Sequence, residues 1–105
     1  MSGTIKRLES IIAERRGASP DSSYVASLFT KGRAKIAQKV GEEATETVIA
    51  ALSGDPDSVT GEAADLLFHL MILLADCGVS MDDVFAELDR RDGISGIAEK
   101  ASRQK

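Results

Sequence analysis

Apolar residues recur along this chain at the three- and four-residue spacing that lets a helix bury one face. The spacing predicts a helix over residues 4–16, which Gly17 ends. The apolar residues of its buried face are Ile5, Leu8, Ile11 and Ile12. Over residues 18–29, Pro20 and the pair Ser22-Ser23 interrupt the pattern, which predicts a connection with one short helical turn.

Two long helices are predicted in the middle of the chain. Thr30 can cap the first, which runs to about residue 52, where the pair Ser53-Gly54 ends it. Its apolar stripe consists of Ile36, Val40, Ala44, Val48 and Ala51. The pair Asp55-Pro56 fits an N-cap followed by a first-turn proline, opening a second helix to about Asp76. Because the connection is tight, we expect the two helices to pack antiparallel.

A shorter helix is predicted near the carboxyl end. Gly78 ends the preceding helix, and Ser80 with Asp83 has the spacing of a capping box. The helix reaches about residue 90, with Val84 and Leu88 facing inward, and residues 94–105 form a short tail with room for one more helix. The sequence therefore predicts an all-α fold of four to five helices. The two long helices carry more apolar surface than their short neighbours can cover, which predicts an oligomer.

Composition agrees with one globular domain over residues 1–105, since 43% of the residues are apolar and 29% are charged. A net charge of −4 argues against nucleic-acid binding by the surface as a whole. The longest apolar stretch, residues 66–75, is too short to span a bilayer, and the amino terminus lacks the apolar core of a secretion signal. We therefore expect no membrane partner and a cytoplasmic protein.

The single cysteine, Cys77, excludes an internal disulfide and a cysteine-rich zinc site, and it fits a reducing compartment. Its position before Gly78 predicts a small residue buried near the end of a helix.

Charge is distributed unevenly. Residues 40–89 contain twelve carboxylates and neither lysine nor arginine. Two clusters, Glu42-Glu43-Glu46 and Glu62-Asp65, place acids on one side of each long helix. Like charges at this spacing repel, so clusters that face each other oppose folding unless a cation lies between them.

The antiparallel arrangement predicts which acids meet. Counted from residue 54, Glu46 and Glu62 are each eight positions away, and Glu43 lies opposite Asp65. A site of three or four carboxylates suits Mg²⁺ or Mn²⁺ and suits zinc poorly. The alternative is a solvated face, on which lysines pair with these acids at the i, i+4 spacing.

A family resemblance enters at these acids. Segments 39–46 and 62–69 resemble the Glu-x-x-Glu and Glu-x-x-Asp signature of the all-α nucleoside triphosphate pyrophosphohydrolases, the MazG-like superfamily. Nearly the whole chain is similar, more closely, to the phosphoribosyl-ATP pyrophosphatases of histidine biosynthesis. This similarity includes Ser-Gly-Ile-Ala-Glu-Lys-Ala in the tail of residues 91–103.

The resemblance implies Mg²⁺-dependent hydrolysis of phosphoribosyl-ATP to phosphoribosyl-AMP and pyrophosphate by a helical-bundle homodimer. A cyclohydrolase domain for the next step is fused in many such proteins, and this chain is expected to be the stand-alone form.

Site roles follow from the resemblance and the chemistry together. Four acids, Glu43, Glu46, Glu62 and Asp65, are expected to hold Mg²⁺, or Mn²⁺ in its place, against the phosphate oxygens and the attacking water. Glu42 is a further ligand, a general base or only the outer member of its pair. Lys35 and Lys39 share the acidic face and either hold the leaving pyrophosphate or form salt bridges.

Several other residues are assigned more loosely. His69 donates to Asp65, contacts a phosphate, or packs in support of the metal site, and packing is the favoured interpretation. Arg33 lies among core positions and is expected to reach a partner subunit or the ribose 5-phosphate. The tail residues Arg91, Ser95, Lys100 and Arg103 are expected to serve docking and dimer packing, not catalysis.

Three functions stay in competition on the sequence. They are the histidine-pathway pyrophosphatase, a house-cleaning nucleoside triphosphate pyrophosphohydrolase, and a non-enzymatic helical oligomerisation module with an acidic surface. The first two share the metal site, and only the tail motif favours the first. The third predicts acids scattered in solvent.

Overall fold

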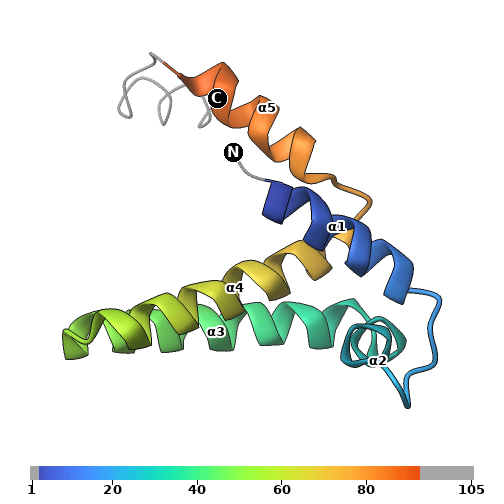
Figure 1. Cartoon of the computed structure of the whole chain (residues 1–105), viewed down its shortest axis with the longest axis horizontal. Coiled ribbons are helices and arrows are strands. Elements are labelled where there is room, and N and C mark those ends of the chain that lie inside the picture. Colours follow the sequence, from blue (N-terminus) through green and yellow to red (C-terminus); the bar gives the residue numbers. More distant parts are fainter. Residues whose placement is uncertain (1–2, 93–105) are drawn as a thin grey trace.

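Five α-helices make up residues 3–92, the part of the chain that this computed structural model describes (Figure 1). They are α1 (Gly3–Arg15), α2 (Tyr24–Lys31), α3 (Arg33–Ser53), α4 (Pro56–Asp76) and α5 (Met81–Arg91). The all-α prediction is confirmed, with the helix count at the upper end of the expected range. The predicted tail of residues 94–105 lies outside the described residues.

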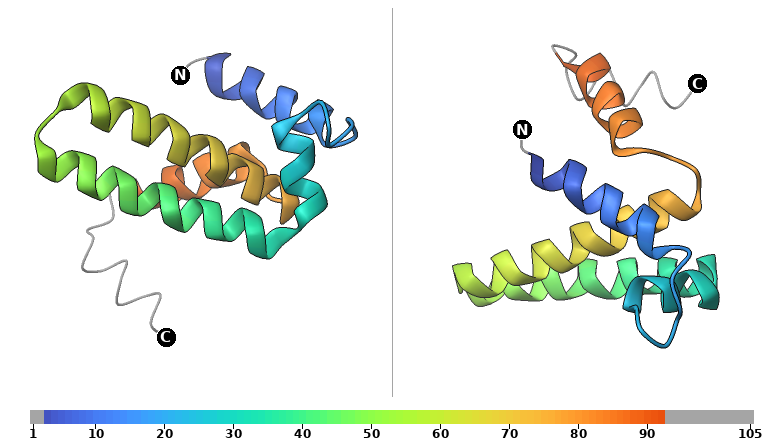
Figure 2. Two further views of the ribbon diagram at one scale, coloured as in Figure 1. Left: turned by 90° about the horizontal axis from the view of Figure 1, so that it is seen from below. Right: turned by 45° about the vertical axis from the view of Figure 1, so that its right-hand side comes forward.

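Helices α3 and α4 form the long antiparallel hairpin that the sequence predicts, and they run side by side in Figures 1 and 2. Gly54 ends α3 with a left-handed φ of 81°, a conformation that glycine adopts without steric cost. The Asp55 side chain accepts a hydrogen bond from the Asp57 backbone N–H, and Pro56 opens α4. The turn thus fixes the depth at which residues of α3 and α4 face each other.

The predicted connection over residues 18–29 is wrong in its second half, because α2 is a complete helix there. Ser23 is its N-cap, and its hydroxyl accepts from the Ala26 backbone N–H at 3.1 Å. A serine that interrupts an apolar pattern can thus start a helix instead of a loop. Gly32, with a φ of 100°, separates α2 from α3, so Thr30 lies inside α2 and caps nothing.

The hydrophobic core lies where α1 and α2 pack against the hairpin, at the end of α3 and α4 away from their connecting turn (Figure 2). The buried core residues are Ile12, Val25, Leu28, Ile36, Met71, Ile72 and Met81. Near the turn, α4 is the one element of the described chain on which α3 packs, so the predicted inward positions Val48 and Ala51 are exposed and Ala50 is buried instead. Leu52 is 83% exposed.

Helix α4 is long and apolar enough, by length and composition alone, to cross a membrane. Within this fold it is a core helix. It packs along α3, and it contributes His69, Met71 and Ile72 to the buried residues. Its apolar character therefore serves the interior of the bundle.

Two arginines hold the carboxyl end of α4: Arg16, which directly follows α1, and Arg33, the first residue of α3. Arg33 donates to the Asp76 carboxylate at 2.7 Å and to the Asp76 carbonyl oxygen at 2.8 Å. Arg16 donates to the Ala75 carbonyl oxygen at 3.0 Å and also pairs with Asp76. Arg33 is exposed instead of lying among core positions, because the Asp76 carboxylate and the last helical carbonyls attract it. Its expected contact with a partner subunit or the ribose 5-phosphate stays a prediction.

Helix α5 begins with the predicted capping box, in which Ser80 and Asp83 each bond the other's backbone N–H. Glu9 of α1 accepts from the Met81 N–H at 2.8 Å and so ties α1 to the start of α5. Beyond this contact α5 extends away from the hairpin (Figure 2). Leu88 is consequently 56% exposed, and its predicted inward position is wrong.

The expected burial of Cys77 is also wrong. The residue caps the carboxyl end of α4 and is exposed. Its neighbour Gly78 turns the chain with a φ of 75° toward α5, so the turn lies at the surface instead of in the core.

Candidate functional site

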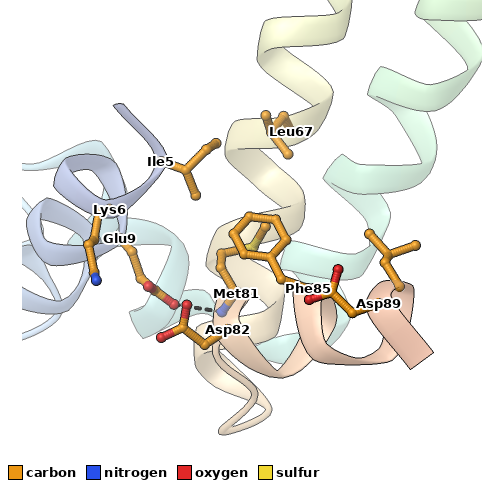
Figure 3. A pocket seen from close by; sticks show the side chains of 9 residues that line it. Ile5, Lys6, Glu9, Leu67, Met81, Asp82, Phe85 and Asp89 are labelled. Atoms are coloured by element: carbon orange, nitrogen blue, oxygen red, sulfur yellow. Dashed lines mark hydrogen bonds between the residues drawn. The ribbon is translucent and has the colours of Figure 1, made fainter. Parts of the chain in front are cut away.

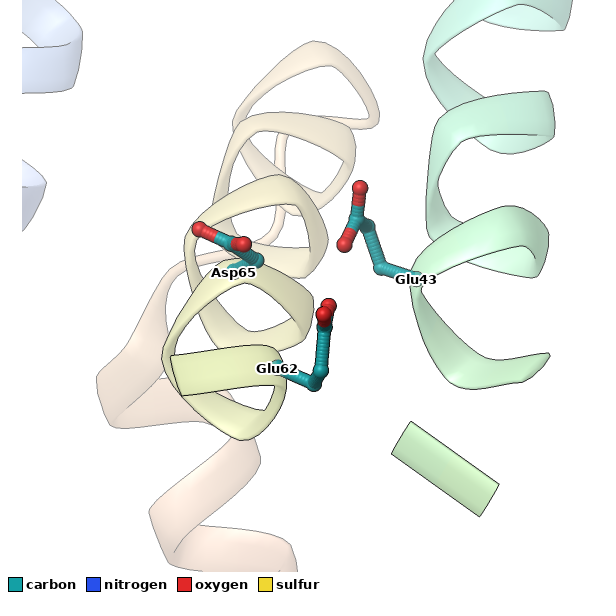
Figure 4. A group of neighbouring side chains, drawn as sticks. All are labelled: Glu43, Glu62 and Asp65. Carbon is teal, nitrogen blue, oxygen red and sulfur yellow. The ribbon is translucent and has the colours of Figure 1, made fainter. Parts of the chain in front are cut away.

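Three carboxylates from the two long helices converge in the middle of the hairpin (Figure 4). Glu62 and Asp65 project from one face of α4, and Glu43 projects toward them from α3. Each residue offers an oxygen, and these oxygens lie within 4.8 Å of one another. Glu43 is buried, Glu62 half-buried and Asp65 exposed, so the cluster is deep on the α3 side and open to solvent at Asp65.

Two oxygens of this cluster, Oε2 of Glu43 and Oε1 of Glu62, are buried and have no hydrogen-bond partner within residues 3–92. Glu43 is only 8% exposed. A buried carboxylate oxygen without a partner loses its hydration and gains nothing in return. A cation bound between the helices would satisfy both atoms, and the donor set of carboxylate oxygens fits Mg²⁺ or Mn²⁺.

The same surroundings raise the pKa of the Glu43 carboxyl above its ordinary value. Burial is the main cause, followed by a hydrogen bond with Glu46 and by the charges of Glu46 and Asp65, with His69 opposing them. Without a bound cation, burial and the neighbouring acids therefore disfavour the charged form of Glu43. A divalent ion reverses this preference, because a bound cation stabilises the ionised ligands.

The other predicted acids of α3 lie at the edge of this cluster. Glu46 is exposed, and it lies where it can accept a hydrogen bond from the protonated Glu43 carboxyl, beside the three converging carboxylates but not among them. Glu42 pairs with its own helix, accepting from Gln38 at 2.8 Å and lying 3.3 Å from the Lys39 ammonium. These two hydrogen bonds lower the pKa of the Glu42 carboxyl, and Gln38 contributes the most.

The two predicted phosphate-binding lysines lie on α3 before the acids. Lys39 forms the ion pair with Glu42, and this hydrogen bond is the main reason that its pKa is raised. Lys35 is half-buried one turn earlier. Neither lysine is paired with Glu43, Glu62 or Asp65 in the contacts that the structure shows.

His69 is buried, at 6% exposed, one turn after Asp65 on α4. Its Nδ1 lies 2.8 Å from the Asp65 backbone oxygen, and its Nε2 lies 2.8 Å from the Tyr24 hydroxyl. The link to Asp65 thus runs through the backbone. Tyr24 was missed by the sequence analysis because it lies in the segment taken for a connection. The signal that could have singled out Tyr24 is that it is the one tyrosine in the sequence.

A separate apolar groove of about 540 Å³ lies among α1, α4 and α5 (Figure 3). Its walls include Ile5, Leu67, Phe85 and Leu88. Leu67 follows Asp65 by two residues, so it points to the opposite side of α4 from the acids. The groove is therefore not part of the acidic site.

Comparison with known proteins identifies the arrangement. The family model described as phosphoribosyl-ATP pyrophosphohydrolase matches residues 5–92. A phosphoribosyl-ATP pyrophosphatase of Rhizorhabdus wittichii is 69% identical over 105 residues, covering 100% of this chain and 99% of the relative. The same protein of Zymomonas mobilis is 65% identical over 102 residues, covering 97% and 95%. That of Erythrobacter litoralis is 64% identical over 100 residues, covering 95% and 96%. The chain that folds into this five-helix structure with its acidic hairpin belongs to the phosphoribosyl-ATP pyrophosphohydrolase family.

Proposed function

We propose that the protein hydrolyses phosphoribosyl-ATP to phosphoribosyl-AMP and pyrophosphate, the second step of histidine biosynthesis, at the acidic site of α3 and α4. The observation that carries the proposal is the convergence of three carboxylates, one of them buried, in a chain that belongs to this family. A non-enzymatic module with acids scattered in solvent does not explain a buried Glu43 with an unpartnered oxygen. The protein acts as one domain in the cytoplasm, where the free thiol of Cys77 stays reduced.

The proposed ligands of Mg²⁺, or of Mn²⁺, are Glu43, Glu46, Glu62 and Asp65. The first two come from α3 and the last two from α4, so both helices would hold the ion. When bound, it supplies positive charge to the phosphate oxygens and to the attacking water. The exposed Asp65 marks the side from which the triphosphate enters, and the buried Glu43 closes the opposite side.

The remaining residues of α3 serve the phosphates. Lys39 and Lys35 contact the leaving pyrophosphate as point charges, one and two turns before the acids. Glu42, held ionised by Gln38 and Lys39, keeps the Lys39 ammonium at the rim of the site. A carboxylate with a lowered pKa is a weak base, so this orienting role suits Glu42 better than proton abstraction from water.

The protein is proposed to work as a homodimer. Two parts of the described chain expose apolar side chains: the turn end of α3, with Val48, Ile49 and Leu52, and the face of α5 with Phe85 and Leu88. The groove beside α5 adds further apolar surface. A second copy would bury these side chains, as the excess of apolar stripe in the sequence suggests.

Metal binding is the first test. Adding Mg²⁺ at millimolar concentration at pH 7 should raise the melting temperature, because the ion binds the folded state by mass action and removes the repulsion among the acids. As the pH falls, protons displace the ion, and the raised pKa of Glu43 places this loss at a higher pH than for an ordinary glutamate. Glu43→Gln should lose the shift and Asp57→Asn should keep it. Melts and calorimetry without any divalent effect would contradict the metal site.

A second test separates the ligands from other surface acids. Glu46→Gln and Asp65→Asn keep the size of the side chain and remove its charge, so each should lower kcat/KM about 100-fold or more. The metal-free protein should be as stable as before or slightly more stable, since a repulsion is relieved. Asp57→Asn, an exposed acid on the first turn of α4, is the control and should have full activity. Equal activity of all three variants would refute the assignment.

Substrate choice distinguishes the proposed reaction from house-cleaning hydrolysis. An enzyme that accepted ATP would deplete the ATP of the cell. We therefore expect kcat/KM for ATP to be about 10⁴-fold lower than for phosphoribosyl-ATP. Deleting the protein from its host should create a histidine requirement that the wild-type copy relieves and a Glu46→Gln copy does not. Comparable kcat/KM for ATP or dCTP, or histidine-independent growth without a second copy of the enzyme, would favour the house-cleaning class.

The oligomer can be tested by light scattering. The wild-type protein should have twice the mass of one chain at micromolar concentration. Leu88→Gln should weaken this association, because it places an amide on an apolar face of α5 that the second copy covers. Ala86→Gln changes the opposite side of α5 and should not weaken it. A wild-type protein with the mass of a single chain would exclude the dimer.

A further inference from the structure

The single tyrosine and the single histidine of this chain are hydrogen-bonded to each other. Tyr24 is the first residue of α2, and its hydroxyl oxygen lies 2.8 Å from Nε2 of His69 on α4. The contact joins segments that are 45 residues apart in the sequence. It is therefore a tertiary link between α2 and the helix that carries Glu62 and Asp65.

The direction of the hydrogen bonds follows from their partners. Nδ1 of His69 lies 2.8 Å from the backbone carbonyl oxygen of Asp65, which can only accept, so Nδ1 carries the hydrogen. In the neutral ring Nε2 is then an acceptor, and the Tyr24 hydroxyl donates to it. Both ring nitrogens of His69 are thereby used, and the ring connects Tyr24 to the backbone of Asp65.

Aromatic packing holds the ring in this orientation. His69 meets Tyr24 edge-on at 5.7 Å between ring centroids and meets Phe68 edge-on at 5.4 Å. Tyr24 and Phe68 stack at 6.5 Å with an interplanar angle of 19°. Ser23, the residue immediately before Tyr24, is buried and caps the start of α2. Two aromatic rings and a helix cap therefore leave His69 little freedom to rotate.

We propose that Tyr24 is a positioning residue of the acidic site, which acts through His69 on the turn of α4 that bears Asp65. The inference rests on the proposed metal site. Hydrogen bonds that orient the ligands of a metal ion are worth about 10- to 100-fold in metal affinity or activity when removed. Here the bond is made to the backbone of the ligand residue, so it fixes where the Asp65 side chain starts.

The position of Tyr24 distinguishes this role from scaffolding alone. Tyr24 is 50% exposed, so only part of its side chain is packed against the rest of the fold. Its hydroxyl reaches inward to a nitrogen that has no other partner in the contacts shown. Removal of the hydroxyl by Tyr24→Phe keeps the ring and its packing on Phe68 and breaks the link to His69.

The test combines metal binding with the spectroscopy of a single imidazole. Tyr24→Phe should weaken Mn²⁺ and Mg²⁺ binding in calorimetry without substrate by about 10-fold or more, and kcat/KM should fall by a similar factor. The ¹⁵N resonances of the one histidine should show Nδ1 protonated in both proteins and a changed Nε2 in the variant. Ser27→Ala is the matched control. It removes another hydroxyl of α2, which donates only to the Tyr24 carbonyl oxygen, and it should change neither measurement.

A double-mutant cycle with His69→Gln tests whether Tyr24 acts through His69. The double variant Tyr24→Phe, His69→Gln should bind metal no more weakly than His69→Gln alone, because His69→Gln already breaks the link from Tyr24 to Asp65. Additive losses of metal affinity would mean that Tyr24 does not act through His69. A raised KM with unchanged metal affinity would mean that Tyr24 contacts the substrate directly. Either result would overturn the inference. An unchanged Nε2 resonance would overturn it as well.

The outcomes separate this inference from the proposed function. A wild-type protein that binds no divalent ion overturns both. A wild-type protein that binds the ion, with a Tyr24→Phe variant that binds it equally well, overturns the positioning role of Tyr24 and leaves the proposed metal site intact.

Discussion

Repulsion among carboxylates that the α3–α4 hairpin forces together is the constraint on which this structure depends. The tight turn at Gly54 sets the register of the two helices, and that register brings Glu43 against Glu62 and Asp65. Burial of Glu43 makes the repulsion stronger than it would be in water, and the raised pKa of this carboxyl expresses the cost. The fold tolerates this arrangement because most of its apolar contacts lie elsewhere, at the end of the hairpin away from the turn.

The rest of the molecule stabilises that strained centre from outside. At one end, α1 and α2 supply the core, and Arg16 and Arg33 clamp the last turn of α4 through Asp76. On the flank of the site, Tyr24 reaches from α2 to His69. These contacts hold α4 against α3 without adding a positive charge between the acids. The carboxylates of Glu43, Glu62 and Asp65 could therefore bind a cation between the two helices.

The acidic cluster and the apolar groove lie on different faces of the same helix. The acids project from one side of α4, whereas Leu67 on the other side lines the apolar groove with Phe85. Helix α5 is attached mainly at its start, where Glu9 bonds the Met81 N–H, and its apolar residues have little of the described chain to cover them. Occupation of one of these two surfaces would therefore leave the other accessible.

The sequence by itself determined four of the five helices in residues 3–92, all but α2, and the acids that share a helical face. Caps and turns are local, so Asp55 with Pro56 and the Ser80 capping box could be read directly, and the spacing of Glu62 and Asp65 fixed their common side. Only the tertiary structure decided which residues meet across helices, because periodicity records the face of a residue but not the rotation of one helix against the next. That rotation buries Glu43 and leaves Glu42 beside Lys39.

The same reason accounts for the errors. Leu88 and Cys77 have patterns typical of buried positions, and each is exposed because no other described element covers it. Tyr24 belongs to no periodic pattern, and its contact with His69 appears only in the folded chain. A hydrogen bond between residues 45 positions apart leaves no periodic trace in the sequence, so only the packed structure could show it.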